Sequence, residues 1–202
     1  MNIVFDIGNV LVDYRPEIYV NALFSDAALA EKINDIIFKS PEWLDMDRGL
    51  LTHEKAVEIF CEREPAYQSA IRNTMQSYCK MFNPLQDFCK TFIAMQDTID
   101  LLPKIKEFGH GLYFLSNMHD ETRNYLLENH DYFDMFDGGV FSCDVKVIKP
   151  SPEIYRYFLQ KYKLNPIECV FFDDMEENVT AAEKEGMKGV LFTTAECVLK
   201  YL

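Results

Sequence analysis

The sequence predicts an α/β protein with a doubly wound parallel sheet and a helical bundle inserted directly after the first strand. From residue 84 onward, short continuous apolar runs alternate with segments of helical periodicity, whereas residues 15–83 show helical periodicity alone. The length of 202 residues, of which 49% are hydrophobic, allows a large core. We therefore expect a core domain of residues 1–14 and 84–202 and a helical domain of residues 15–83.

The first strand is expected at residues 2–6, NIVFD, because its apolar run is continuous and contains β-branched and aromatic residues. The insert that follows has its most regular helical segments at residues 25–40, 51–60 and 65–82, and the phrase SPEW begins a further helix. Three helix starts carry a side chain that accepts hydrogen bonds from free first-turn N–H groups: Ser25 or Asp26, Ser40 and Thr52.

Strands and helices alternate after the insert. Short apolar runs predict strands at residues 111–117, 138–144, 168–174 and 188–194. Helical patterns are found at residues 98–109, 119–130, 151–162 and 176–186, and a short helix is expected at the C-terminus. Gly109 and Gly186 end two of these helices, and Pro152 stands at the first position of another. This alternation is typical of a parallel sheet with helices on both faces.

The composition limits the classes of partner. A net charge of −13, a pI near 4.7 and no cluster of Lys or Arg argue against a nucleic acid or an anionic membrane as partner. The N-terminal residues lack a signal-peptide pattern, and no apolar run reaches membrane-spanning length, so we expect a cytoplasmic protein. Nothing in the sequence indicates the oligomeric state. The cysteines lack metal or redox spacing and are expected to be free, buried thiols: Cys61, Cys79, Cys89, Cys143, Cys169 and Cys197.

Chemically useful side chains stand at or near the ends of four expected strands. In an open parallel sheet, ligands bind beyond the carboxyl ends of the strands, so these side chains are expected to meet at one edge. Alone, each residue is as well explained by a turn, a helix cap or a solvated charge, and only their conjunction indicates a site. They are Asp6, Ser116 with Asn117, Lys149, and Asp173 with Asp174.

The chemistry of this set is that of phosphoryl transfer. Two adjacent carboxylates at a buried strand end invite a cation, and oxygen ligands favour Mg²⁺ over zinc or copper, so we expect Mg²⁺ between Asp6 and the pair Asp173 and Asp174. An aspartate that attacks a phosphate monoester needs such a metal, because both groups are anions. Ser116 and Lys149 would donate to the phosphoryl oxygens. Attack by Asp6 would give an aspartyl-phosphate that water hydrolyses.

This constellation resembles the haloacid dehalogenase superfamily of aspartate-nucleophile phosphatases. The resemblance rests on the phrases DIGNV, LSN, IKPSPEIY and FFDD, and it extends through both ends of the chain. It implies a Rossmann-like core and a helical cap of the class that closes over small phosphorylated metabolites. It also implies that Asp6 is the nucleophile, that Lys149 is catalytic, and that Ser116 and Asn117 bind substrate. The subgroup whose first motif reads D-x-G-N-V includes sugar-phosphate phosphatases.

Gly8 departs from the superfamily's usual first motif, in which a second aspartate acts as general acid and base. The main-chain carbonyl of Gly8 can still take the metal-ligand position that the resemblance implies, because that contact needs no side chain. Asp13 and His119 are candidates for the missing proton-transfer group, although a turn explains Asp13 and a surface or capping role explains His119 equally simply. Without such a group, good leaving groups would be favoured, as in sugar 1-phosphates, aryl phosphates or acyl phosphates.

In the insert, the phrase EWLDMDRG places Arg48 among acidic residues. Arg48 is a candidate for contact with a substrate phosphate or a sugar hydroxyl, and a local ion pair is the alternative. Methionine and aromatic residues of the insert helices are expected to form its core.

Three other functions compete with the phosphatase. The first is a dehalogenase of the same superfamily, in which an aspartate attacks carbon without a metal, although the acidic pair after VFF favours Mg²⁺ and phosphate. The second is a non-catalytic protein that binds phosphate or a partner, with Gly8 as the sign of lost turnover. The third is a receiver-like signalling module, but in that class the acidic pair comes first along the chain, whereas here it comes last.

Overall fold

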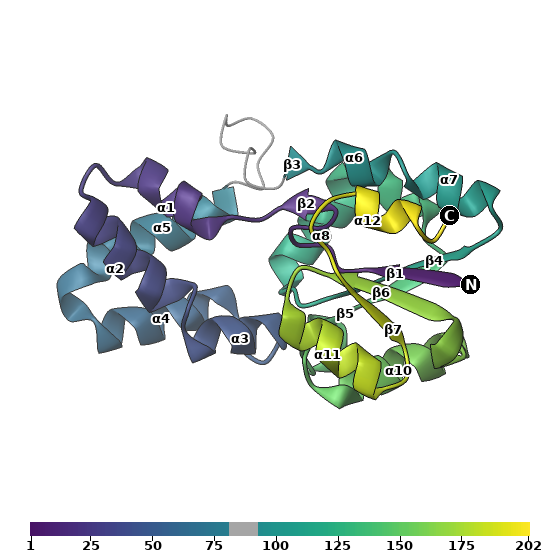
Figure 1. The fold of residues 1–202 in the computed structure, drawn as a ribbon. Helices are drawn as coiled ribbons and strands as arrows, with labels where there is room; N and C mark the ends of the chain where they lie inside the picture. Colours follow the sequence, from purple (N-terminus) through teal and green to yellow (C-terminus); the bar gives the residue numbers. More distant parts are fainter. Residues whose placement is uncertain (81–92) are drawn as a thin grey trace.

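A five-stranded parallel sheet forms the centre of the computed structural model, which describes the backbone of residues 1–80 and 93–202 and the side chains of residues 1–78 and 93–202 (Figure 1). The strand order is β5-β4-β1-β6-β7, and every neighbouring pair is parallel. The strands are β1 Asn2–Phe5, β4 Gly111–Ser116, β5 Gly138–Phe141, β6 Cys169–Asp173 and β7 Lys188–Leu191. The predicted doubly wound α/β fold is confirmed.

Several predicted segments are wrong in detail. The strand expected at residues 188–194 ends at Leu191. The strand expected at residues 138–144 ends at Phe141, because Ser142–Val145 forms the helical turn α9, which Lys146 closes in the left-handed conformation. The helix expected at residues 98–109 is two helices, α6 Gln96–Ile99 and α7 Leu102–Glu107. Pro103 in the first turn of α7 favours a new helix start there.

Helices cover both faces of the sheet. In Figure 1, α6, α7 and α12 (Glu196–Leu199) lie above the sheet, and α10 (Pro152–Tyr162) and α11 (Glu176–Lys184) lie below it. Successive residues of β1 serve opposite faces, since Ile3 and Phe5 belong to one apolar cluster and Val4 to the other. The remaining helical elements described around the sheet are α8 Asp120–Asn129, η3 Asp131–Met135 and η4 Pro166–Glu168.

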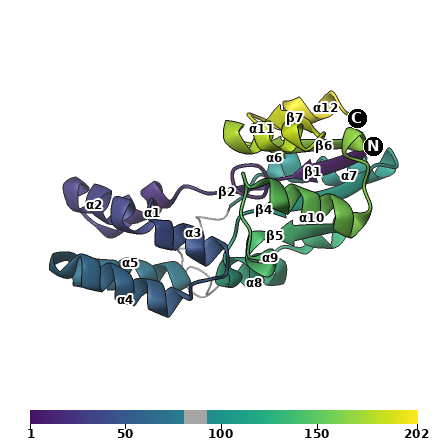
Figure 2. The same cartoon turned by 90° about the horizontal axis from the view of Figure 1, so that it is seen from below.

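The inserted helices form a separate bundle at the end of the sheet where the strands finish (Figures 1 and 2). We call them the cap helices: α1 Pro16–Leu23, α2 Ala27–Ile37, α3 Pro41–Asp47, α4 His53–Arg63, η1 Pro65–Tyr67 and α5 Gln68–Lys80. The predicted N-caps are confirmed, with Asp26 chosen over Ser25. Side-chain oxygens of Asp26, Ser40 and Thr52 accept first-turn N–H groups of α2, α3 and α4 at 2.9, 3.1 and 3.3 Å.

The two chain segments that join the sheet to the cap helices lie side by side. Val12–Asp13 (β2) pairs antiparallel with Ile93–Ala94 (β3), far apart in sequence. Two-residue strands are too short to give a periodic pattern, so this pairing was not predicted. The predicted domain boundary between residues 83 and 84 lies outside the described residues.

Four cysteines have described side chains, and all four are free thiols. Cys61, Cys143 and Cys169 are buried and Cys197 is partly exposed, whereas the side chains of Cys79 and Cys89 lie outside the described residues. Within the described part of the chain, no helix has the length and apolar character needed to cross a membrane.

Candidate active site

Asp6 stands directly after β1, the middle strand of the sheet. Its main-chain N–H donates to the carbonyl oxygen of Phe172 at 2.8 Å, so the pairing with β6 continues one residue past the strand. Its carboxylate accepts the N–H of Ile7 at 2.7 Å and is almost fully buried. The sheet therefore holds this carboxylate rigidly at its carboxyl edge.

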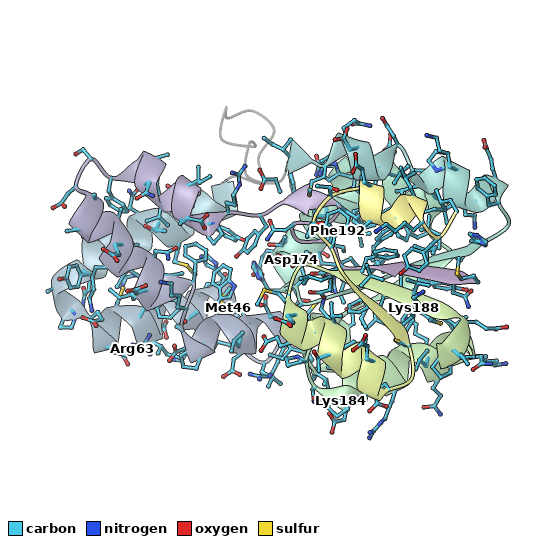
Figure 3. The ribbon with its side chains drawn as sticks, in the orientation of Figure 1. Met46, Arg63, Asp174, Lys184, Lys188 and Phe192 are labelled. Carbon is cyan, nitrogen blue, oxygen red and sulfur yellow. The ribbon has the colours of Figure 1, made fainter. Side chains whose placement is uncertain are left out.

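The acidic pair at the end of β6 has two different environments. Asp173 is fully buried and accepts hydrogen bonds from the main-chain N–H of Met175 at 2.8 Å and from the side-chain amide of Asn178 at 3.0 Å. Asp174 is partly exposed and accepts a hydrogen bond from the side-chain amide of Asn9 at 2.9 Å. Figure 3 shows Asp174 between the sheet and the cap helices. Asp173 is thus fixed by the core, and Asp174 faces the space in front of it.

The Lys149 ammonium lies between two of these carboxylates. Its Nζ is 2.8 Å from Asp6 Oδ1 and 2.6 Å from Asp173 Oδ2, and the side chain is buried. Asn117 holds the main chain of Lys149 from both sides: its amide oxygen accepts the Lys149 N–H at 2.7 Å, and its amide nitrogen donates to the Lys149 carbonyl at 3.0 Å. The LSN turn after β4 therefore positions the lysine.

The site carries an excess of negative charge. Oxygen atoms of Asp6, Asp173 and Asp174 lie within 4.8 Å of one another, against the single ammonium of Lys149. Burial raises the pKa of Asp6 to about 7, although Lys149 opposes this shift. Burial also raises the pKa of Asp174, against the hydrogen bond from Asn9. Burial alone would lower the pKa of Lys149, but the Asp6 and Asp173 charges outweigh it, and that pKa is raised. This set of clustered oxygen donors fits a divalent cation such as Mg²⁺.

A cavity of about 400 Å³ opens in front of these carboxylates, between the sheet and the cap helices. The core lines it with residues that follow the strands, and the cap side lines it mainly with aromatic and apolar residues. Core residues at the cavity include Asp6, Gly8, Asn9, Ser116, Asn117, His119, Lys149, Asp174 and Asn178. Residues from the cap side are Tyr14, Pro16, Phe38, Trp43, Leu44, Asp47 and Tyr78.

Two predicted site residues are not brought to this cavity. Asp13 is outside the described lining, and its carboxylate pairs with the guanidinium of Arg15. Arg48 is also outside the described lining, and its Nη1 lies 2.8 Å from Asp45 Oδ1. In both cases the side chain pairs with an opposite charge two or three residues away in the chain. For Arg48, this local ion pair is the alternative to substrate contact that the sequence left open.

His119 is neither a surface residue nor a side-chain cap. It is buried, and its ring nitrogens lie 3.2 Å from Asp47 Oδ1 of α3 and 2.9 Å from Thr122 Oγ1 of α8. Its ring packs edge-on against Trp43, with centroids 5.1 Å apart. His119 therefore joins the core to the cap at the cavity.

Several lining residues were missed by the sequence reasoning. Asn9 donates to Asp174 and Asn178 donates to Asp173. Asn9 stands inside the DIGNV phrase, and no local signal indicated its contact with Asp174. Aromatic residues of the cap helices were expected to be core alone. Phe38, Trp43 and Tyr78 do pack on one another, but they also line the cavity.

Comparison of sequences finds hydrolases of one family. The sequence model of the haloacid dehalogenase-like hydrolases matches residues 1–186. The sesquiterpene phosphatase astK of Aspergillus oryzae is 27% identical over 190 residues, which are 94% of this chain and 88% of that protein. The (S)-2-haloacid dehalogenase 4A of Burkholderia cepacia is 29% identical over 94 residues, which are 46% of this chain and 41% of that protein.

Comparison of structures agrees on the fold. The crystal structure of the HAD family enzyme bt-2542 from Bacteroides thetaiotaomicron matches with a TM-score of 0.74 and 20% identity, over 100% of this chain and 98% of that one. A complex of the same enzyme with magnesium and inorganic phosphate matches with a TM-score of 0.64 and 20% identity, over 96% of this chain and 94% of that one. The family match extends over most of the sequence, and the chain belongs to the haloacid dehalogenase-like hydrolases.

Proposed function

We propose that this hydrolase is a Mg²⁺-dependent phosphatase that acts on a small phosphate monoester through an aspartyl-phosphate at Asp6. The observation that carries the proposal is the convergence of Asp6, Asp173 and Asp174 within 4.8 Å, beside the buried Lys149, with Asp6 and Asp174 lining a cavity of about 400 Å³. A haloacid dehalogenase needs no metal, so this carboxylate cluster favours phosphate chemistry.

Each residue of the site has a role in this proposal. Asp6 attacks phosphorus and displaces the alcohol, and Ser116, a buried residue of the cavity lining, donates to a phosphoryl oxygen together with Lys149. Asp6, Asp174 and the Gly8 carbonyl would hold Mg²⁺, with Asp173 as a further acidic partner. The bound ion would neutralise charge between the attacking carboxylate and the phosphate.

The comparisons support this choice without deciding the substrate. One relative that covers most of the chain is a sesquiterpene phosphatase, and a similar fold binds magnesium and inorganic phosphate. The comparisons do not test the sugar phosphate that the resemblance of the D-x-G-N-V motif implies. His119 lines the cavity, unlike Asp13, and is the better placed of the two candidates for proton transfer.

A phosphatase screen with added Mg²⁺, run on the wild-type protein and on Asp6→Asn, tests the proposal. We expect turnover that EDTA abolishes and that Asp6→Asn lowers by at least about a thousandfold, because the nucleophile is lost. Equal activity in the two proteins would rule out attack by Asp6. No activity in either protein would favour a non-catalytic binding protein, and EDTA-resistant release of halide from 2-chloropropionate would favour the dehalogenase.

A further inference from the structure

One wall of the cavity is formed by the cap helices, and this wall is mainly aromatic. Three aromatic residues of this wall, which we call the aromatic cluster, are Phe38, Trp43 and Tyr78. Phe38 directly follows α2, Trp43 belongs to α3 and Tyr78 belongs to α5. Ring centroids are 4.6 Å apart for Phe38 and Trp43 and 5.4 Å apart for Trp43 and Tyr78. Leu44 continues this wall and is 43% exposed. The cluster offers ring faces and edges to the part of a substrate that extends away from the phosphate.

The charged side chain of the cap wall and the lysine of the cavity both have partners. Asp47, the charged residue that the described cap helices contribute to the lining, bonds His119. Among the lining residues that the structure describes, Lys149 is the lysine or arginine present, and it is paired with Asp6 and Asp173. A second phosphate or a carboxylate on the substrate would therefore be buried against the aromatic cluster without a counter-charge, which is unfavourable.

Hydroxyl-rich groups also fit this wall poorly. The Tyr78 hydroxyl lies 3.4 Å from Thr122 Oγ1, which is 2.9 Å from His119 Nε2, and His119 Nδ1 bonds Asp47. These polar atoms bond one another across the boundary between cap and core. Several sugar hydroxyls facing the cap would lose water and gain few hydrogen bonds there, at a cost in binding free energy.

Resting on the proposed phosphatase function, we propose that the substrate is the phosphate monoester of an uncharged, mainly apolar alcohol or phenol, and that the aromatic cluster and Leu44 select it. The phosphate lies at the carboxylates, and the hydrocarbon part lies against the cap. Burial of apolar surface in this cavity supplies the selectivity.

A matched pair of substrates tests the proposal. Cyclohexylmethyl phosphate and glucose 6-phosphate both carry a six-membered ring and both release a primary alcohol, but only the sugar ring carries hydroxyls. With wild-type protein and Mg²⁺, we expect kcat/KM to be at least about tenfold higher for cyclohexylmethyl phosphate. Equal values, or a preference for glucose 6-phosphate, would overturn the proposal.

Two exposed leucines of the cap provide matched variants. Leu44 lines the cavity, whereas Leu50, 62% exposed, is outside the described lining. Leu44→Gln is expected to raise KM for cyclohexylmethyl phosphate by roughly fivefold and to change kcat by less than about twofold, since the interaction is one of binding. Leu50→Gln is expected to change neither. The same effect in both variants would contradict the role of this wall.

Binding to Asp6→Asn separates this proposal from the phosphatase itself. Trp43 is the only tryptophan of the chain, so intrinsic fluorescence reports on the cap wall. Cyclohexylmethyl phosphate is expected to change this fluorescence at a lower concentration than glucose 6-phosphate. If cyclohexylmethyl phosphate binds more tightly but the wild-type protein hydrolyses neither compound, the proposed preference for an apolar ligand stands and the phosphatase function is rejected. Tighter or equal binding of glucose 6-phosphate would reject the specificity even if turnover is found.

Discussion

Gly8 is the residue at which this site differs from the two-carboxylate motif that it resembles. A Cβ atom on Gly8 would meet nothing closer than the Tyr14 Cβ, at 3.9 Å, which is ordinary van der Waals contact. Gly8 also lines the cavity that holds Asp6. Packing does not exclude a side chain here, so the missing carboxyl group is a difference in chemistry and not a steric necessity.

Gly8→Asp is therefore expected to supply the missing acid. For cyclohexylmethyl phosphate, whose leaving group needs a proton, kcat should rise by about tenfold or more, and for p-nitrophenyl phosphate it should change little. The check is steady-state kinetics on both substrates. Gly8→Asn is the control, because it has a similar shape and no acid. A similar gain in both variants would attribute the effect to shape and contradict the proton-transfer argument.

The short helix α3 contributes several of the cap residues that line the cavity. It presents Trp43, Leu44 and Asp47 to the cavity, and Trp43 and Asp47 are one helical turn apart on the same face. After the helix, the Gly49 carbonyl accepts a hydrogen bond from Lys146 Nζ at 2.7 Å. The helix α3 thus contributes part of the cavity wall, and the turn that follows it contacts the core.

The start of α3 depends on Ser40, which is buried. Its Oγ accepts the Trp43 N–H at 3.1 Å and donates to the Ile37 carbonyl at 2.7 Å. Ser40→Ala should lower the free energy of unfolding by about 1 kcal/mol, measured by urea denaturation. The matched control is Ser151→Ala at the N-cap of α10, where the side chain makes no capping hydrogen bond, and a change within about 0.5 kcal/mol is expected. An equal loss in both variants would contradict the capping argument.

On the scale of the whole molecule, the clustered carboxylates work against stability. Burial holds the pKa of Asp6 at about 7, above its ordinary value of 3.8, so ionising this group costs folding free energy. The folded protein holds the proton more tightly than the unfolded chain does. The stability that this group contributes is therefore complete below pH 3.8 and is lost as pH rises through about 7.

Asp6→Asn should consequently stabilise the metal-free protein in alkaline solution. At about pH 8 in EDTA, the free energy of unfolding is expected to rise by on the order of 1 kcal/mol or more, and the gain should shrink toward about pH 4. Urea denaturation at several pH values is the measurement. Asp13→Asn, at an aspartate outside the described lining, is the control and should show no such gain. A pH-independent effect of Asp6→Asn would refute the linkage.

Local sequence was enough to predict the residues at the strand ends. Asp6, Ser116, Lys149 and Asp173 follow apolar runs or short motifs, and the topology of a parallel sheet brings such positions to one edge. The choice between a site role and a local ion pair for Arg48 was not decidable in this way, because both depend on where its side chain points. The structure pairs Arg48 with Asp45, three residues earlier in the chain, and a helical pattern does not say which of its possible partners a side chain meets.

By itself, the sequence determined the parallel sheet, the helical insert and the cluster of carboxylates at the strand ends, since periodicity and strand-end residues are local properties of the chain. Tertiary structure decided what faces those carboxylates. The packing of the cap helices against the core made their aromatic residues a wall of the cavity and placed His119 between Asp47 and Thr122. The physical reason is that a helix pattern specifies which face is apolar but not which surface that face will meet.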